Sequence, residues 1–289
     1  MPAPILILTG KANSGKDTLA GFLVKNHGAV AIASADPMKR FARDVLGFSE
    51  DSLWGPSEAR NAVDLRGVDA IARLYYENHE AVVDWLQDVF GEDEDYDRFL
   101  AHLDAWHSRH LCKDRLTVSA RHVLQTLGTE FGRSIDPNCW INYSLRMATK
   151  VLNEGGGYER LSGYVPGQGR PSMVVVSDGR FANEVMAVKS MGGVAVKIDP
   201  GEALSLKGQA GQHQSETQQD GIPLFWFDAV VENRKALGLA QLEANVDQLV
   251  TTLWPTVRIP FVGTVGVNAI DSAYVKQGLP WSRGPAHNE

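Results

Sequence analysis

The chain has 289 residues, of which 44% are hydrophobic, and its formal net charge is −7. This is enough apolar material for one large α/β core, or for a core that carries an inserted subdomain. The negative charge disfavours broad nucleic-acid binding, which needs clustered lysines and arginines. No apolar run reaches membrane-spanning length, and the start MPAPILILTG lacks the basic residues and cleavage site of a signal peptide. We therefore expect a cytoplasmic protein with no nucleic-acid or membrane partner, and we interpret Cys112 and Cys139 as reduced thiols.

A short apolar run followed by a glycine-containing loop opens the chain. Residues 5–8 read ILIL, which is typical of a strand buried on both faces of a parallel sheet. The next stretch, GKANSGKDT, has the spacing of a phosphate-binding loop, in which backbone N–H groups and a helix N-terminus surround a phosphate and a lysine reaches it. The alternative is a chance glycine-rich turn. The sequence predicts an ATP or GTP site formed by Gly10, Asn13, Ser14, Gly15, Lys16, Asp17 and Thr18.

Strands and helices alternate through most of the remaining chain. Residues 29–47 predict a second strand that turns at Asp36-Pro37 into a helix, and residues 173–199 predict a strand, a helix and a further strand. A glycine-rich break is expected at 153–172, a last strand at 227–233, and helices at 120–133, 139–152 and 239–254. The alternation predicts an α/β fold in which helices cover a parallel sheet.

Residues 49–117 differ from their surroundings. They are acidic, contain Trp54, Trp85 and Trp106, and show the apolar spacing of helices. We interpret them as an inserted helical region in a core formed by residues 1–48 and 118–254. Residues 255–289 hold four prolines and four glycines with little periodicity, which predicts a tail or a wrapping arm.

Several short blocks occur in a fixed order along residues 4–254. They are GKANSGKDT, ADPMKRFA, VLQTLGTEFGR followed by CW, VVVSDGRFANE, MGGVAVKI, HQSET and VVEN. In this combination and order the blocks resemble the deoxynucleoside monophosphate kinases of tailed bacteriophages, which belong to the P-loop kinase superfamily. The resemblance implies a three-layer P-loop kinase fold and phosphoryl transfer from ATP to a deoxynucleoside monophosphate with Mg²⁺. It also implies a place in the host cytoplasm. The insertion 49–117 and the tail lie outside the resemblance; we expect the insertion on the acceptor side or in a lid, and we allow for a homodimer.

On the donor side, the resemblance implies that Lys16 is catalytic and that Thr18 contacts Mg²⁺ directly or through water. Asp17 falls at the start of the following helix, where a carboxylate is favoured by the helix dipole. We prefer that interpretation of Asp17 to one as a metal ligand.

On the acceptor side, Asp178 and Arg180 follow a predicted buried strand, at the sheet edge where ligands of α/β folds collect. The resemblance implies that Arg180 grips the acceptor phosphate, and that Asp178 contacts the sugar or organises the arginine or the metal. Glu184 could hold Arg180 or the base. The alternative is a capping aspartate beside an exposed arginine.

The predicted helix 120–133 supplies a polar stripe, because Arg121, Gln125 and Thr129 are spaced four apart. We expect this stripe to line the acceptor pocket, with Glu130, Arg133 and Trp140 close behind. Trp140 either stacks on the base or lies in the core. Asp36 and Lys39, at the second strand-to-helix turn, complete the set, and Lys39 either neutralises the acceptor phosphate as a catalytic cation or lies on the surface.

One position departs from the family pattern. Asp199 stands where the family often has an arginine, so either Lys197 or Lys207 substitutes for it, or the lid contributes less. His213 and Glu216 match a family block but could form a local cap. His102, His107, His110 and Cys112 suggest zinc, yet there is no paired-cysteine spacing, so we favour packing histidines.

Two other functions fit part of the pattern. A different small-molecule P-loop kinase, of the dephospho-coenzyme A or phosphomevalonate kinase type, would share the loop. A nucleotide-switched binding module would also share it, although the chain has no N-K-x-D guanine motif.

Overall fold

The computed structural model describes residues 4–11, 13–91, 96–111, 117–167, 169–201, 218–234, 238–254 and 268–269. The chain divides into two compact units. The first unit is formed by Met1–Ala31 and Ser177–Glu289, and the second by Ile32–Val176. The insertion boundaries expected at residues 49 and 117 stay a prediction.

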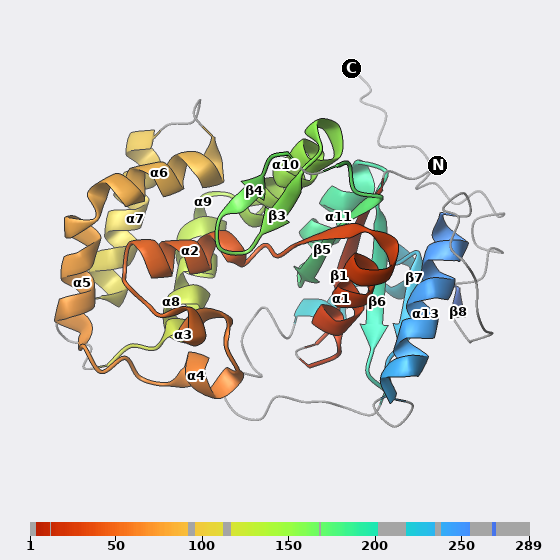
Figure 1. Ribbon diagram of the computed structural model, residues 1–289. Helices are drawn as coiled ribbons and strands as arrows, with labels where there is room; N and C mark the ends of the chain where they lie inside the picture. Colours follow the sequence, from red (N-terminus) through yellow and green to blue (C-terminus); the bar gives the residue numbers. More distant parts are fainter. Residues whose placement is uncertain are drawn as a thin grey trace, which may run out of the picture. The chain divides into compact units, whose positions relative to one another are not determined.

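A six-stranded sheet has the strand order β2-β5-β1-β6-β7-β8 (Figure 1). The bounds are β1 (Ile5–Thr9), β2 (Ala29–Ile32), β5 (Met173–Gly179), β6 (Val194–Asp199), β7 (Ala229–Glu232) and β8 (Asn268–Ala269). Five strands are parallel, whereas β8 is antiparallel to β7. The prediction of an α/β fold with a parallel sheet flanked by helices is confirmed.

Fully buried strands explain the apolar runs of the sequence. The five residues of β1 are all buried, and β1 pairs with β6 from Leu6 opposite Val194 to Thr9 opposite Lys197. Strands buried on both faces lose the polar alternation of half-exposed strands. The run ILIL therefore lies at the centre of the sheet.

Three helices of the first unit cover this sheet. They are α1 (Lys16–His27), α11 (Ala182–Ser190) and α13 (Gly238–Leu253). The chain moves in opposite directions along the sheet from β1 to β2 and from β5 to β6, so right-handed crossovers place α1 and α11 on opposite faces. In Figure 1, α1 and α13 lie in front of the sheet and α11 lies behind it. Short 3₁₀ turns, η3 (Gln218–Gly221) and η4 (Leu224–Trp226), precede β7.

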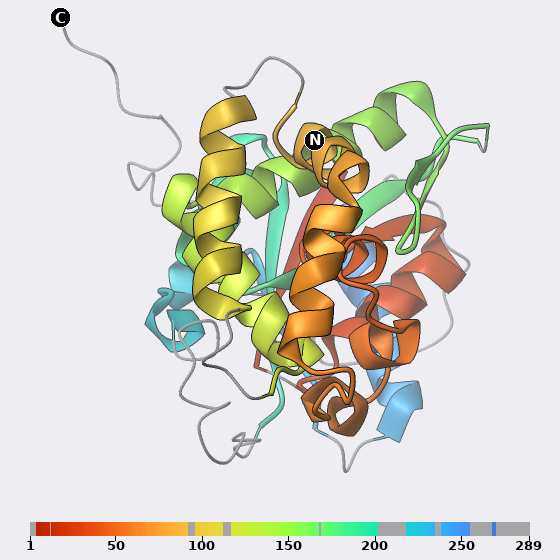
Figure 2. The same ribbon diagram turned by 90° about the vertical axis from the view of Figure 1, so that its left-hand side faces the viewer.

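The second unit is mainly helical, and Figure 2 shows its helices from the front. Its elements are α2 (Asp36–Asp44), α3 (Glu50–Trp54), α4 (Ser57–Asn61), α5 (Val68–Glu77), α6 (His79–Phe90), α7 (Tyr96–His110), α8 (Ala120–Thr126), the π-helix η1 (Leu127–Gly132), α9 (Arg133–Ile135), α10 (Cys139–Glu154), β3 (Gly157–Glu159) and β4 (Gly163–Val165). A continuous apolar cluster joins α2 with α5, α6, α7 and α8, and the rings of Phe41 and Trp85 lie 4.6 Å apart in it.

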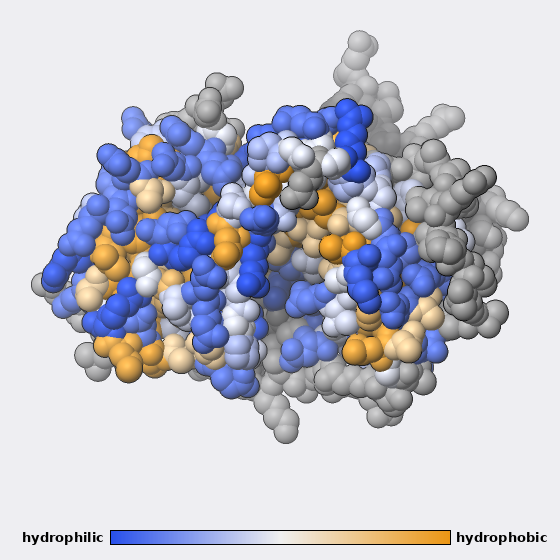
Figure 3. Space-filling model, viewed as in Figure 1, coloured by the Kyte–Doolittle hydropathy of each residue, from blue (hydrophilic) through white to orange (hydrophobic). Residues whose placement is uncertain are grey.

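The surface of these helices is mixed. Figure 3 shows hydrophilic residues over most of the visible face of α5 to α7, with hydrophobic side chains scattered among them. Val63, Leu65 and Tyr76 are exposed hydrophobic residues of this unit. Scattered apolar residues are normal on a folded surface. None of the described helices is both long and apolar enough to cross a membrane.

The structure differs from the sequence-based expectation at three places. The predicted break at 153–172 contains the antiparallel hairpin β3–β4. The predicted single helix 120–133 changes to π-helical geometry at Leu127. The prediction that 227–233 holds the last strand is wrong, because β8 in the expected tail pairs with β7 and satisfies backbone groups of what would otherwise be an edge strand.

Candidate active site

The loop between β1 and α1 has the backbone conformation that its glycines allow. Gly10, Asn13 and Gly15 have positive φ angles of 154°, 62° and 97°. A Cβ atom on Gly10 would lie 2.9 Å from the Ile198 carbonyl oxygen, and one on Gly15 would lie 2.1 Å from Asn233 Nδ2. Side chains at these two positions would therefore be strained by conformation and by contact. The predicted order of strand, loop and helix is confirmed.

Lys16 folds back over this loop. Its side chain is buried, and Nζ donates hydrogen bonds to the carbonyl oxygens of Gly10 at 2.5 Å and of Lys11 at 2.8 Å. An ammonium needs such partners when it leaves water. The positive charge of Lys16 consequently lies beside the loop backbone, where it would attract an anion.

Asn233, which lies directly after another strand, forms a hydrogen bond with the loop. It follows β7, its Nδ2 donates to the Ser14 carbonyl oxygen at 2.7 Å, and its backbone N–H donates to the Asp199 carbonyl oxygen at 2.7 Å. Ser14 is fully buried. Asn233 therefore braces the loop between its two glycines, a role that sequence analysis missed. The only sequence signal was the position of this asparagine at the end of the VVEN block.

Asp17 and Thr18 lie in the first turn of α1, and both are exposed. Mg²⁺ in nucleotide sites is usually held by one or two protein ligands together with phosphates and water. The described residues contain no cluster of three or more His, Cys, Asp or Glu side chains that could hold a metal alone. An accessible Thr18 hydroxyl therefore fits a Mg²⁺ that arrives with a nucleotide.

Asp178, Arg180 and Glu184 belong to the same unit. Strands β5 and β1 are neighbours in the sheet, so the segment after β5 and the loop after β1 leave the same carboxyl edge. Glu184 is 5% exposed, and its Oε2 accepts the backbone N–H groups of Arg180 at 2.7 Å and Phe181 at 3.0 Å. Glu184 thus caps the start of α11 and sets the backbone of Arg180, whereas contact with a base stays a prediction.

Asp36 and Lys39 lie at the start of α2 in the second unit. Asp36 is 4% exposed, and its Oδ1 accepts the indole N–H of Trp54 at 3.1 Å. The Lys39 ammonium lies 3.7 Å from the same oxygen. A buried carboxylate needs a donor and a nearby cation. Asp36 is therefore partly neutralised by Lys39, one turn further along the helix.

The predicted polar stripe is bent by the π-helix. Arg121 Nη2 lies 3.5 Å from Ser57 Oγ, and Thr129 Oγ1 donates to the Gln125 carbonyl oxygen at 2.7 Å. Because a π-turn holds more residues than an α-turn, Thr129 does not continue the α-helical line through Arg121 and Gln125. The single straight stripe is corrected in this respect, and its contact with an acceptor stays a prediction.

Trp140 lies under the π-helix. It is 3% exposed, and its indole N–H donates to the Gly128 carbonyl oxygen at 2.9 Å. A Cβ atom on Gly132 would lie 2.3 Å from the Trp140 ring. This burial favours the core interpretation of Trp140 over stacking on a base. Glu130 is exposed and Arg133 half-buried on the same segment.

With this geometry established, comparison with known proteins adds one observation. No protein-family model matches the chain. A protein of Acanthamoeba polyphaga mimivirus, named "Putative deoxynucleotide monophosphate kinase", is 23% identical over 234 residues, which cover 80% of this chain and 88% of that protein. The similarity supports a kinase-like relationship in coarse terms. Bacteriophage origin and the P-loop superfamily stay predictions.

The histidines of α7 have structural partners. His107 Nε2 lies 3.1 Å from the Ala72 carbonyl oxygen, and its ring stacks on Tyr75 with centroids 4.4 Å apart. His110 Nε2 lies 2.9 Å from Glu130 Oε2. His102 is exposed on the same helix. These contacts involve packing and hydrogen bonding.

The predicted lid residues lie partly outside the described residues. Lys207, His213 and Glu216 lie outside the described residues, and so does Cys112 of the weighed zinc cluster. Lys197 is half-buried on β6, with Nζ 5.8 Å from the centroid of the Phe227 ring, and Asp199 is exposed at the end of β6. The cation that replaces the family arginine stays a prediction.

Proposed function

We propose that the chain is an ATP-dependent kinase that converts deoxynucleoside monophosphates to diphosphates. The observation that carries the proposal is the turn between β1 and α1, where Gly10 and Gly15 have positive φ angles and the Lys16 ammonium donates to the Gly10 and Lys11 carbonyl oxygens. Such a loop is suited to the β and γ phosphates of a nucleotide. The similarity to a viral protein named as a deoxynucleotide monophosphate kinase supports the choice of acceptor.

The proposed reaction needs charge neutralisation and positioning rather than protein nucleophiles. An oxygen of the acceptor phosphate attacks the γ-phosphorus of ATP, the bond from that phosphorus to the β-bridging oxygen breaks, and ADP leaves. Lys16 would hold the β and γ oxygens. Thr18 would help to hold Mg²⁺, which supplies charge neutralisation when bound. Arg180 and Lys39 would bind phosphate oxygens, and Arg121, Gln125 and Asp178 would position the acceptor.

A coupled assay of ADP formation tests the proposal. ATP and Mg²⁺ are combined with each common ribo- and deoxyribonucleoside monophosphate, with dephospho-coenzyme A, with phosphomevalonate, and with no acceptor. We expect turnover that depends on a deoxynucleoside monophosphate. Turnover with dephospho-coenzyme A or phosphomevalonate alone would show that the acceptor is not a nucleoside monophosphate. ATP hydrolysis without any acceptor would favour a nucleotide-switched binding module.

A further inference from the structure

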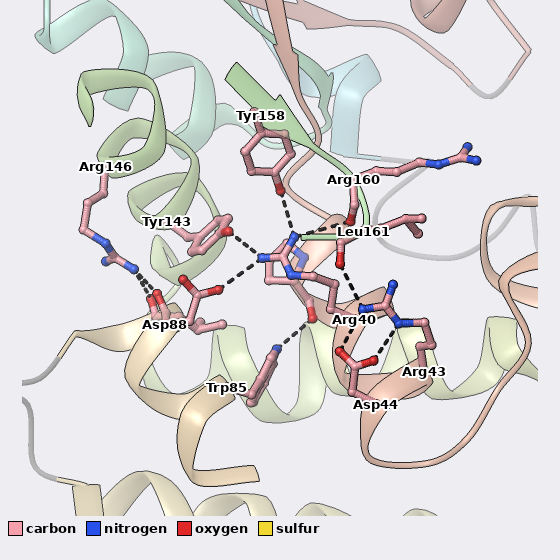
Figure 4. A network of polar contacts seen from close by, with 12 residues as sticks. Arg40, Arg43, Asp44, Trp85, Asp88, Tyr143, Arg146, Tyr158, Arg160 and Leu161 are labelled. Carbon is pink, nitrogen blue, oxygen red and sulfur yellow. Dashed lines mark hydrogen bonds and ion pairs between the residues drawn. The ribbon is translucent and has the colours of Figure 1, made fainter. Parts of the chain in front are cut away.

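The β3–β4 hairpin is attached to α2 through the carbonyl groups of its turn. Arg40 Nη1 donates to the Arg160 carbonyl oxygen at 3.5 Å and to the Tyr158 hydroxyl at 3.1 Å. Arg43 Nη2 donates to the Leu161 carbonyl oxygen at 2.9 Å. Two arginines one helical turn apart therefore hold the backbone of the turn, as Figure 4 shows.

Arg40 is a rigid anchor for this attachment. It is 7% exposed, and Nη2 donates to the Tyr143 hydroxyl at 2.5 Å and to Asp88 Oδ2 at 3.1 Å. Burial alone would lower the pKa of Arg40, but the oxygens of Tyr158, Tyr143 and Asp88 raise that pKa above its ordinary value. The buried guanidinium therefore stays charged and holds α2, α6, α10 and the hairpin together.

The side chain of Arg160 takes no part in this anchor. Figure 4 shows it extending away from Arg40. It is exposed, and the described part of the chain gives its guanidinium neither a hydrogen bond nor an ion pair. Its contact is with Trp54, whose ring centroid lies 5.9 Å from Arg160 Cζ. The hairpin thus delivers one uncompensated positive charge to the Trp54 ring.

Two further cations surround the same ring. Lys39 Nζ lies 5.5 Å from the Trp54 centroid, and Arg43 Cζ lies 5.9 Å from it. Lys39 faces Asp36, and Arg43 forms a bidentate pair with Asp44 at 2.6 and 3.0 Å. Because Lys39 and Arg43 are each paired with a carboxylate, Arg160 adds a positive charge that these two carboxylates do not balance. In a chain with a net charge of −7, such a gathering of cations is a candidate anion site.

We propose that Arg160, Lys39 and Arg43, arranged around Trp54, bind the phosphate group of a phosphate monoester, which in the proposed reaction is the acceptor nucleotide. The assignment to the acceptor rests on the proposed function. Arg160 is the decisive residue, because its guanidinium can offer two parallel donors to phosphate oxygens and has no competing carboxylate partner among the described residues.

Equilibrium binding by the full chain tests this site. Titration calorimetry would measure each deoxynucleoside monophosphate, the matching deoxynucleosides, ribose 5-phosphate, and ATP with Mg²⁺. The variants are Arg160→Gln, Arg160→Lys and the control Arg73→Gln, which removes an exposed arginine of α5 that has no described side-chain partner. We expect Arg160→Gln to weaken monophosphate binding about ten- to a hundredfold, the range for a lost charged hydrogen bond. Deoxynucleoside and ATP binding should be unchanged, and Arg160→Lys should recover part of the loss.

The outcomes separate this site from the proposed function. If the parent turns over monophosphates but Arg160→Gln binds them as Arg73→Gln does, the phosphate site is overturned and the kinase assignment stands. If the parent turns over no nucleotide, yet binds ribose 5-phosphate in an Arg160-dependent way, the assigned reaction fails and the phosphate site stands. Binding of no phosphate monoester by the parent would overturn the site. Equal unfolding midpoints for all variants would show that each remains folded.

Discussion

Lys16 combines burial with a position at the loop, and this makes its removal informative. We expect Lys16→Ala to lower the turnover number about 100- to 1000-fold, because charge that develops on the phosphates would lose its partner. The matched control is Lys25→Ala, on the exposed side of the same helix, where the lysine side chain is 75% exposed. The coupled assay measures both, and circular dichroism checks the fold. Turnover by Lys16→Ala near the parent's rate would remove Lys16 from the donor site.

Arg180 offers a test of geometry at constant charge. Its backbone is set by Glu184, and a guanidinium can contact phosphate in a bidentate way that an ammonium cannot reproduce. We expect Arg180→Lys to lower kcat/KM for the monophosphate while ATP binding by titration stays unchanged. If Arg180→Lys and Arg180→Ala both match the parent within a factor of about two, Arg180 takes no part in binding the acceptor phosphate.

Gln125 tests the acceptor stripe of α8. A glutamine amide can both donate to and accept from a base edge, so its truncation should affect one substrate. We expect Gln125→Ala to raise KM for the monophosphate far more than KM for ATP. Gln87→Ala, at an exposed position of α6, serves as the control. Equal changes in both KM values would place the acceptor elsewhere.

At the scale of elements, the packing of the π-helix η1 involves Gly128, Gly132 and Trp140. The Gly128 carbonyl oxygen accepts the Trp140 indole N–H, and Gly132 lies against the Trp140 ring. A methyl group on Gly132 would enter the Trp140 ring at 2.3 Å, whereas one on Gly21, inside α1, would meet nothing within 4 Å. We expect Gly132→Ala to lower the free energy of unfolding by about 1 to 3 kcal/mol or more, the cost of overpacking. Gly21→Ala should raise it by about 0.5 to 1 kcal/mol. Denaturant unfolding compares the two, and equal effects would contradict the packing seen at Gly132.

Sequence patterns predicted the sheet well, since buried parallel strands such as ILIL and VVV are continuous and apolar. The hairpin β3–β4 was missed because its strands are three residues each, GYE and GYV, and begin with glycine. The loop could be located because its glycines and lysine are close in sequence. Asn233 and the cations around Trp54 could not, because tertiary contacts join residues from distant segments.

At the scale of the whole molecule, His107 should make stability depend on pH. Burial lowers its pKa below the ordinary 6.5, and this is partly offset by the hydrogen bond to Ala72 and by Asp104. Above pH 6.5, the His107 imidazole is neutral in both the folded and the unfolded state. As the pH falls, the unfolded state binds the proton first, because its pKa is the higher one. The contribution of His107 to stability is therefore fully present above pH 6.5 and is lost as the pH falls towards the lower pKa of the folded state.

Substitution of this histidine gives the measurement. Between about pH 7.5 and pH 5.5, the parent should lose more unfolding free energy than His107→Gln in urea titrations. His102→Gln, which changes an exposed histidine of the same helix, should behave as the parent does. An identical acid response in the parent and His107→Gln would assign the pH dependence to other groups.

The bond between Asn233 and Ser14 has a consequence for how the protein is made. The two residues are 219 positions apart, so a ribosome has produced the whole loop long before the amide that braces it exists. At about 5 to 20 residues per second, this delay is roughly 10 to 40 s. β6, which pairs with β1, also appears late, at Val194. The loop of the nascent chain therefore lacks its hydrogen bond from Asn233 until the segment after β7 has been synthesised. A bound nucleotide should stabilise only chains that have passed this stage of synthesis.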